Sequence, residues 1–92
     1  MKDKITIEKI EKYRKITQQA LAMAKENIVK DRNSEAKEII EMVEAYLSDS
    51  QHFQDKEDYI NAFSCLSYAH GWLDSGARLK VFDVSDNRLF TV

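Results

Sequence analysis

The scarcity of helix-breaking residues constrains this chain more than any other feature. Proline is absent from its 92 residues, and glycine occurs only twice, at Gly71 and Gly76. Proline kinks or ends a helix, and an interior glycine weakens a helix by roughly 1 kcal/mol relative to alanine. The chain is therefore suited to long, continuous helices. Its hydrophobic fraction of 43% is ordinary for a globular protein and too high for a disordered one.

Apolar residues recur at three- and four-residue steps in three segments, which is the spacing of one helix face. We therefore predict helices at about residues 6–30, 34–54 and 58–79. The positions expected to face the core are Ile10, Tyr13, Thr17, Ala20, Leu21, Ala24 and Ile28, then Ala36, Ile39, Ile40, Val43, Tyr46, Leu47, Ser50 and Phe53, then Ala62, Leu66, Ala69, Leu73, Gly76 and Ala77.

Similar helix lengths and short connections favour antiparallel neighbours. The predicted fold is all-α: an antiparallel up-and-down three-helix bundle that forms one domain over residues 1–92. Thr6 and Asp58 are the expected N-caps of the first and third helices, and Asn33 or Ser34 that of the second. A chain of this length supports one thin core with little room for a deep pocket.

The tail, residues 80–92, carries more apolar side chains than a free segment should expose. They are Val81, Phe82, Val84, Leu89, Phe90 and Val92. We expect two short extended runs, 81–84 and 88–92, in a tail that packs on the bundle or on a second subunit. The expected packing surface is the back of the third helix, where small residues recur at helical spacing. These are Ser64, Ser67, Gly71 and Ser75.

Charge and cysteine content narrow the classes of partner. The net charge is −2, but residues 1–32 carry +4 and residues 33–92 carry −6. Nucleic-acid binders are strongly basic overall, so this role is not favoured. The single Cys65 excludes an intrachain disulfide and suits a reducing compartment. We expect no leader peptide, no membrane span and a cytoplasmic location.

The run Tyr68-Ala69-His70-Gly71-Trp72-Leu73-Asp74, followed by Gly76, resembles the archaeal family called domain of unknown function 357. The segments Asp58–Ala62 and Leu89–Val92 also resemble that family. In this family we expect glycine at position 57 and alanine at position 75, where this chain has Glu57 and Ser75 instead. The resemblance implies a small up-and-down helical bundle and an archaeal cytoplasmic origin. It implies no activity, because the family has none assigned.

Three residues of the third helix could form a polar site. His70, Asp74 and Arg78 follow one another at four-residue steps, so their side chains are neighbours on a helix. Asp74 could orient the His70 ring and pair with Arg78, an arrangement suited to holding an anion or to general-base chemistry. The structural alternative is an Asp74–Arg78 ion pair beside a half-buried histidine. No nucleophile accompanies them, so we assign no catalytic residue.

The back of the third helix suggests a contact surface. Gly71 lies there and is the better candidate for touching a partner, whereas Gly76 is expected to permit close packing in the core. Trp72 and Tyr68 flank this surface, and aromatic residues with one exposed edge are frequent at interfaces. The alternative is that Trp72 closes the core. No metal-ligand spacing and no cofactor motif is present.

These features favour a protein-interaction or structural module that acts through the third helix and the tail, with an unidentified protein or a second copy as partner. The alternative is a small-molecule or anion-binding protein, enzymatic or not, that uses His70, Asp74 and Arg78. Whether the run from His70 to Asp74 serves function or structure is not determined by the sequence.

Overall fold

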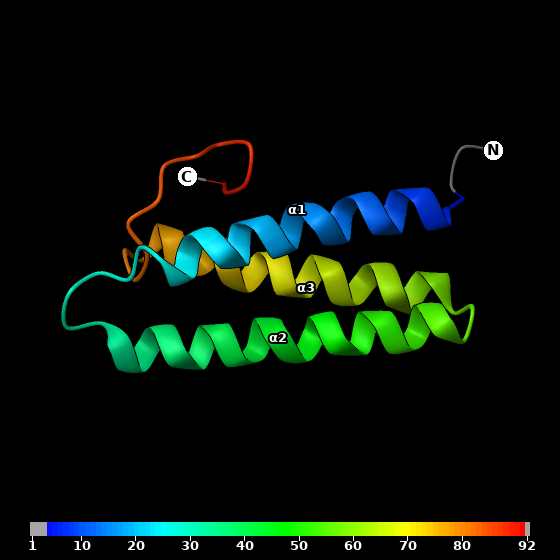
Figure 1. Cartoon of the computed structure of the whole chain (residues 1–92), viewed down its shortest axis with the longest axis horizontal. Helices are drawn as coiled ribbons and strands as arrows, with labels where there is room; N and C mark the ends of the chain where they lie inside the picture. Colours follow the sequence, from blue (N-terminus) through cyan, green and yellow to red (C-terminus); the bar gives the residue numbers. More distant parts are fainter. Residues whose placement is uncertain (1–3, 92) are drawn as a thin grey trace.

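The computed structural model describes residues 4–91; residues 1–3 and Val92, the last residue of the predicted tail, lie outside it. Three helices follow one another in antiparallel order: α1 (Ile7–Lys25), α2 (Asn33–Asp55) and α3 (Tyr59–Arg78) (Figure 1). Residues 4–91 contain no strand. The prediction of an all-α, antiparallel three-helix bundle is confirmed.

The predicted N-cap residue is correct for two of the three helices, α1 and α3. The side chains of Thr6 and Asp58 each accept a hydrogen bond from the backbone N–H three residues further on. This contact satisfies a donor that the helix itself leaves without a partner. The cap predicted for the second helix is wrong. Asn33 is already helical, and Arg32 stands at the cap position without a side-chain bond.

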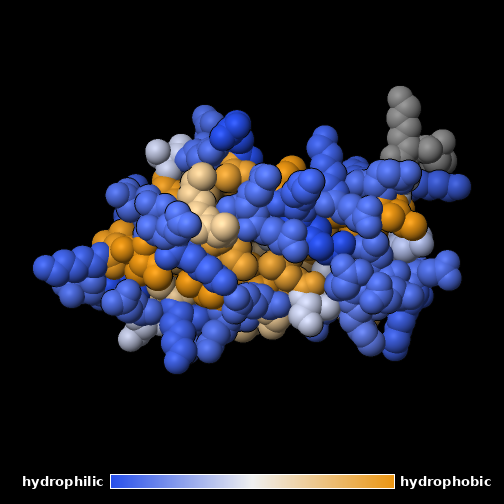
Figure 2. All heavy atoms as spheres, in the orientation of Figure 1, coloured by the Kyte–Doolittle hydropathy of each residue, from blue (hydrophilic) through white to orange (hydrophobic). Residues whose placement is uncertain are grey.

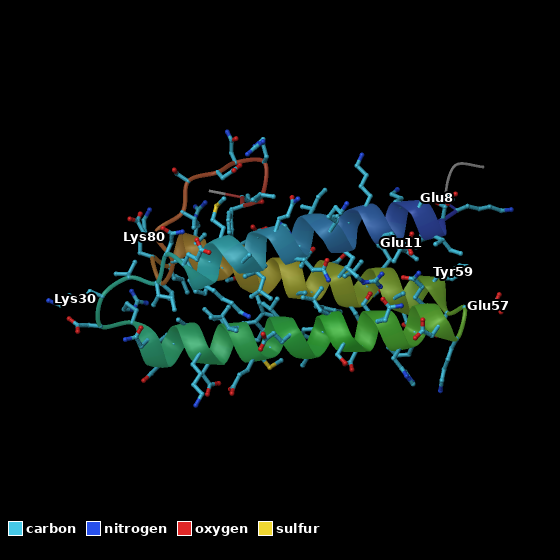
Figure 3. All side chains as sticks on the ribbon, in the orientation of Figure 1. Glu8, Glu11, Lys30, Glu57, Tyr59 and Lys80 are labelled. Carbon is cyan, nitrogen blue, oxygen red and sulfur yellow. The ribbon has the colours of Figure 1, made fainter. Side chains whose placement is uncertain are left out.

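The first helix ends at Lys25, well before the predicted end at residue 30. The chain leaves the helix because the following residues pair with the tail instead. The Val29 N–H donates to the Val81 carbonyl at 2.9 Å, and the Asp83 N–H donates to the Asn27 carbonyl at 2.7 Å. Figure 3 shows why this pairing is possible, since the α1–α2 connection and the start of the tail lie at the same end of the bundle.

The tail supplies part of the core. Val81, Phe82 and Phe90 are buried together with apolar residues of all three helices. The Phe82 ring lies directly over Gly76, where a Cβ atom would come within 2.5 Å of it. Gly76 therefore permits close packing, as the sequence predicted.

The predicted place of the tail is wrong. It packs beside Gly76 and α1, not on the row of small residues at the back of α3. Apart from its chain neighbours and the backbone of its own helix, no atom of residues 4–91 lies within 4 Å of where a Gly71 Cβ would be. The predicted extended runs reduce to one isolated bridge between Ile28 and Phe82. Phe82 determines this outcome, because a large ring gains more from the closed core than from an open helix surface.

Left-handed residues terminate α2 and α3. Glu57 has φ 61° and Lys80 has φ 63°. Beyond them, the Asp58 N–H donates to the Phe53 carbonyl and the Val81 N–H donates to the Gly76 carbonyl, at 2.8 and 2.9 Å. These are the bonds of a Schellman cap, a position that favours glycine. Glu57 therefore occupies the position where the family pattern expects glycine.

Helix α3 lies between α1 and α2 in Figure 1 and packs more extensively on α2 than on α1. Helices α1 and α2 touch each other least. Figure 2 shows hydrophilic side chains over the outward surfaces of α1 and α2, with hydrophobic atoms along the seam between them. The central position of α3 leaves one of its sides inside the core and the opposite side free of either neighbour.

Candidate functional site

Of the three polar residues singled out on α3, His70 contacts α1, Asp74 contacts the tail, and Arg78 is exposed beside Ser75 and Leu79. His70 is largely buried: its ring stacks on Tyr13 of α1, with centroids 5.8 Å apart and planes 21° apart. Its Nδ1 atom lies 3.4 Å from the Thr17 hydroxyl oxygen. That hydroxyl donates to the Tyr13 carbonyl at 3.0 Å, so an Nδ1–H of His70 can donate to its oxygen. His70 is thereby fixed between α1 and α3.

Asp74 holds the tail against α3. Its Oδ1 atom accepts a hydrogen bond from the Thr91 N–H at 2.9 Å and lies 3.7 Å from His70 Nε2. The longer distance is an ionic contact at most, because it exceeds hydrogen-bond range. The predicted Asp74–Arg78 ion pair does not form, and no ion pair joins Arg78 to another residue of 4–91. The Asp74 carboxylate instead accepts a hydrogen bond from the backbone of the tail.

An open depression of 410 Å³ lies beside this contact. Its lining residues are Asp74, Ser75, Arg78, Leu79 and Thr91. Two of the three predicted residues, Asp74 and Arg78, therefore line one hollow, whereas His70 does not line it. The lining offers a carboxylate, a guanidinium and two hydroxyls. It can bind a small polar group, but it sets no base against a nucleophile as covalent catalysis requires.

The opposite side of α3 forms a second surface, which we call the outer face. It consists of Ser64, Ser67, Tyr68, Gly71, Trp72 and Ser75, with Ile60 and Leu79 at its two ends. Its central depression measures 350 Å³ and is lined by all of the six except Ser64. Tyr68 stacks on Tyr46 of α2 with centroids 5.5 Å apart, which fixes the border of this face.

Exposed hydrophobic side chains concentrate on the outer face. Among residues 4–91, the large hydrophobics that are exposed are Ile7, Ile60, Tyr68, Trp72 and Leu79. All except Ile7 belong to this face or its ends, with exposed fractions of 71%, 62%, 38% and 64% for Ile60, Tyr68, Trp72 and Leu79. Trp72 is not among the buried residues of the core. Ile60 was not among the residues predicted from sequence to lie here, although its spacing from Ser64 and Ser67 places it on this face.

A buried cation is the main polar feature that sequence reasoning missed. Arg14 is 8% exposed and donates to the Gln54 amide oxygen at 2.6 Å and to the Ser50 hydroxyl at 2.8 Å. The Ser50 hydroxyl in turn donates to the Ala62 carbonyl, so the cluster joins all three helices. Burial lowers the pKa of Arg14, although Glu11 and Asp55 act against this. Its position, four residues after the buried Ile10, is the signal that could have identified it.

Cys65 lies on the flank of α3 that faces α2. Burial is the main cause that raises the pKa of its thiol, and the negative charges of Asp49 and Asp58 act in the same direction. A raised pKa leaves less thiolate, which makes this cysteine a poor nucleophile. Within residues 4–91, no group of three or more His, Cys, Asp and Glu side chains is arranged to hold a metal ion.

Membrane insertion through a helix has no support in the described part of the chain. None of α1, α2 and α3 combines the length and the apolar content that a span across a bilayer requires.

Comparison with known proteins identifies the family. The family model described as protein of unknown function (DUF357) matches residues 12–82, which include all of α2 and α3 and most of α1. No curated protein and no solved structure matches the chain. The matched residues end at Phe82, so the likeness of Leu89–Val92 to the family stays a prediction from sequence. The chain belongs to the DUF357 family of proteins of unknown function.

Proposed function

We propose that this protein is an interaction module that binds another polypeptide through the outer face of α3. The observation that carries the proposal is the concentration of exposed hydrophobic side chains on one side of α3, where Arg78 lies beside Ser75 and Leu79 at one end. Tyr68 and Trp72 stand beside a depression that no part of residues 4–91 fills. A contiguous apolar patch bordered by polar residues is typical of protein contact sites.

Gly71 supports the same function. A glycine inside a helix lowers stability by roughly 1 kcal/mol relative to alanine. At Gly76 this loss of stability is compensated, because Phe82 packs closely over the glycine. Gly71 has open space in front of it, so nothing within the described chain compensates for its presence. Close approach of a partner's backbone is a physical reason to have glycine there.

The tail contributes one edge of this surface. Because Val81, Phe82 and Phe90 are buried in the bundle, the tail has little apolar surface left for a partner. Its Thr91 is bound to Asp74, next to Ser75 of the outer face. We therefore assign the tail a supporting role: it closes the core and borders the contact site.

A photo-crosslinker tests the proposal. A photoreactive phenylalanine analogue is placed at Ser67, on the outer face, and in a matched variant at Ala45, which is exposed on α2. The proteins are irradiated in cells that make them, and adducts are identified by mass spectrometry. We expect polypeptide adducts, with the same chain or another, from position 67 and none above background from position 45. Equal labelling from both positions, or none from either, contradicts the proposal.

The depression beside Arg78 supports a second candidate, binding of a small anion. The guanidinium is exposed in the last turn of α3, has no ion pair with another described residue, and lies near the hydroxyls of Ser75 and Thr91. Arginine is well suited to carboxylate and phosphate. Titration with inorganic phosphate, followed by NMR shifts of these residues, tests it. Arg78→Ala should remove the shifts, whereas shifts that persist in this variant exclude the site.

A further inference from the structure

A further hollow, which we call the Phe63 pocket, lies between α1 and α3. It measures 350 Å³ and is more enclosed than the depressions beside Gly71 and Arg78. Its lining residues, four from α1 and one from α3, are Lys9, Lys12, Tyr13, Ile16 and Phe63. Pockets that bind small molecules measure roughly 300–1,000 Å³, so the Phe63 pocket suits a small ligand built on a single ring.

Aromatic rings form one wall of the Phe63 pocket. The Tyr13 ring stacks on Phe63, with centroids 5.2 Å apart and planes 24° apart, and it also stacks on His70. These contacts between α1 and α3 fix the positions of Tyr13 and Phe63. Both rings are only half-buried, as is Ile16, so the pocket offers apolar surface to a ligand. A further ring gains there from offset or edge-to-face contact.

Two exposed lysines border the same pocket. Lys9 and Lys12 lie three residues apart on α1, so their ammonium groups are neighbours of like charge, which is unfavourable. Neither forms an ion pair with Glu8, Glu11 or any other residue of 4–91. Glu11 is turned to the α2 side, where it accepts a hydrogen bond. The Lys9 ammonium lies instead 5.9 Å from the centroid of the Phe63 ring. An anionic group in the pocket relieves the repulsion between the two ammonium groups.

The rings and the lysines together select the chemistry of the ligand. Lysine ammonium groups bind carboxylate and phosphate as point charges. The lining of the Phe63 pocket contains no carboxylate, so a cationic ligand finds no partner there. A purely inorganic anion leaves the aromatic wall unused, and a neutral ring leaves the two lysines without a counter-charge. A molecule that combines an aromatic ring with an anionic group uses both parts of the pocket.

We propose that the Phe63 pocket binds a small aromatic anion. The ring of this ligand lies against Tyr13, Ile16 and Phe63, and its carboxylate or phosphate group is held by Lys9 and Lys12. The proposal does not depend on the interaction function, because no lining residue of this pocket belongs to the outer face. A ligand with one ring has few atoms, so we expect a Kd of about 0.1–1 mM.

An NMR titration of the full chain tests the ligand class. Phenylacetate and phenyl phosphate carry the same ring with different anionic groups, phenylacetamide lacks the charge, and acetate lacks the ring. We expect saturable shifts at Tyr13, Ile16 and Phe63 with at least one of the two aromatic anions, and the tighter one identifies the anionic group. Phenylacetamide and acetate should bind at least about tenfold more weakly. Phenylacetamide that binds as tightly as the anions, or no saturable shift with either anion, overturns the proposal.

Two double variants with the same net charge test the role of the lysines. Lys9→Gln combined with Lys12→Gln should raise the Kd of the tighter anion by at least about tenfold. Lys30→Gln combined with Lys37→Gln removes the same charge from exposed positions outside the pocket and should leave the Kd nearly unchanged. All four positions are exposed, so both variants should fold. Equal weakening in the two variants would mean that only net charge matters, and overturns the proposed site.

Arg78→Ala distinguishes the Phe63 pocket from the depression at the end of α3. This variant removes the cation of that depression and should leave the shifts at Tyr13, Ile16 and Phe63 as they are in the wild-type chain. If the shifts disappear in Arg78→Ala, the probe binds beside Arg78 and the Phe63 pocket is excluded. The crosslinking experiment at Ser67 reads a different surface, so failure of the pocket and failure of the interaction function are separate results.

Discussion

The two glycines of α3 differ in what they face, although each carries the same intrinsic penalty in a helix. Gly76 looks into the core, where Phe82 and Ile39 leave no room for a methyl group. Gly71, on the opposite side, looks into open space. A small residue in a helix can therefore mean close packing within the chain or an open surface. The apolar periodicity of α3 distinguished the two glycines, but it did not predict that Phe82 of the tail would cover Gly76.

The largest expected change in the free energy of unfolding comes from removing the Phe82 ring, which packs over Gly76. Phe82 is fully buried, and the large-to-small change Phe82→Ala should lower the free energy of unfolding by about 3–5 kcal/mol. Urea denaturation followed by circular dichroism measures it. Phe82→Leu serves as a milder variant if the alanine form does not fold. A loss below about 1 kcal/mol would mean that the tail is not part of the core.

Gly76→Ala should lower the free energy of unfolding by about 1–2 kcal/mol. Overpacking typically costs about 1–3 kcal/mol, and the gain in helix propensity returns up to about 1 kcal/mol. In the Phe82→Leu background the ring is gone, so the same substitution should cost less or become stabilising. A double-mutant cycle measures this coupling. An identical loss in both backgrounds contradicts the assigned contact with Phe82.

Gly71→Ala should have the opposite sign. Because the new methyl group meets no other segment of residues 4–91 within 4 Å, the free energy of unfolding should rise by about 1 kcal/mol. Urea denaturation is carried out at low protein concentration, so that any association between copies does not contribute. A decrease in stability would show that the space over Gly71 is filled in solution, and would remove the contrast with Gly76.

The smallest effects are expected at the left-handed residues that end α2 and α3. Glu57→Gly and Lys80→Gly relieve a backbone conformation that is unfavourable for residues with a Cβ. Part of the gain is lost because glycine also makes the unfolded chain more flexible. We expect increases of about 0.5 kcal/mol each, seen as small rises in Tm. Lys56→Gly is the matched control: Lys56 has φ −91°, so glycine relieves nothing there and should lower the Tm.

The candidate sites show where a local pattern stops being informative. Four-residue spacing correctly placed His70, Asp74 and Arg78 on one helix, but it predicted an Asp74–Arg78 pair that does not form. The Thr91 N–H takes the Asp74 carboxylate. Thr91 is 17 residues further along the chain, so helix periodicity contains no information on this contact.

Local sequence was sufficient to specify the three helices, because apolar periodicity and the absence of helix breakers act over a few residues at a time. It was also sufficient for the caps at Thr6 and Asp58, since a cap depends on its immediate neighbours. The end of α1, the place of the tail and the side chain that covers Gly76 depend instead on contacts between distant segments. Phe82 sets all three, because its ring gains most by closing the core between segments far apart in the sequence.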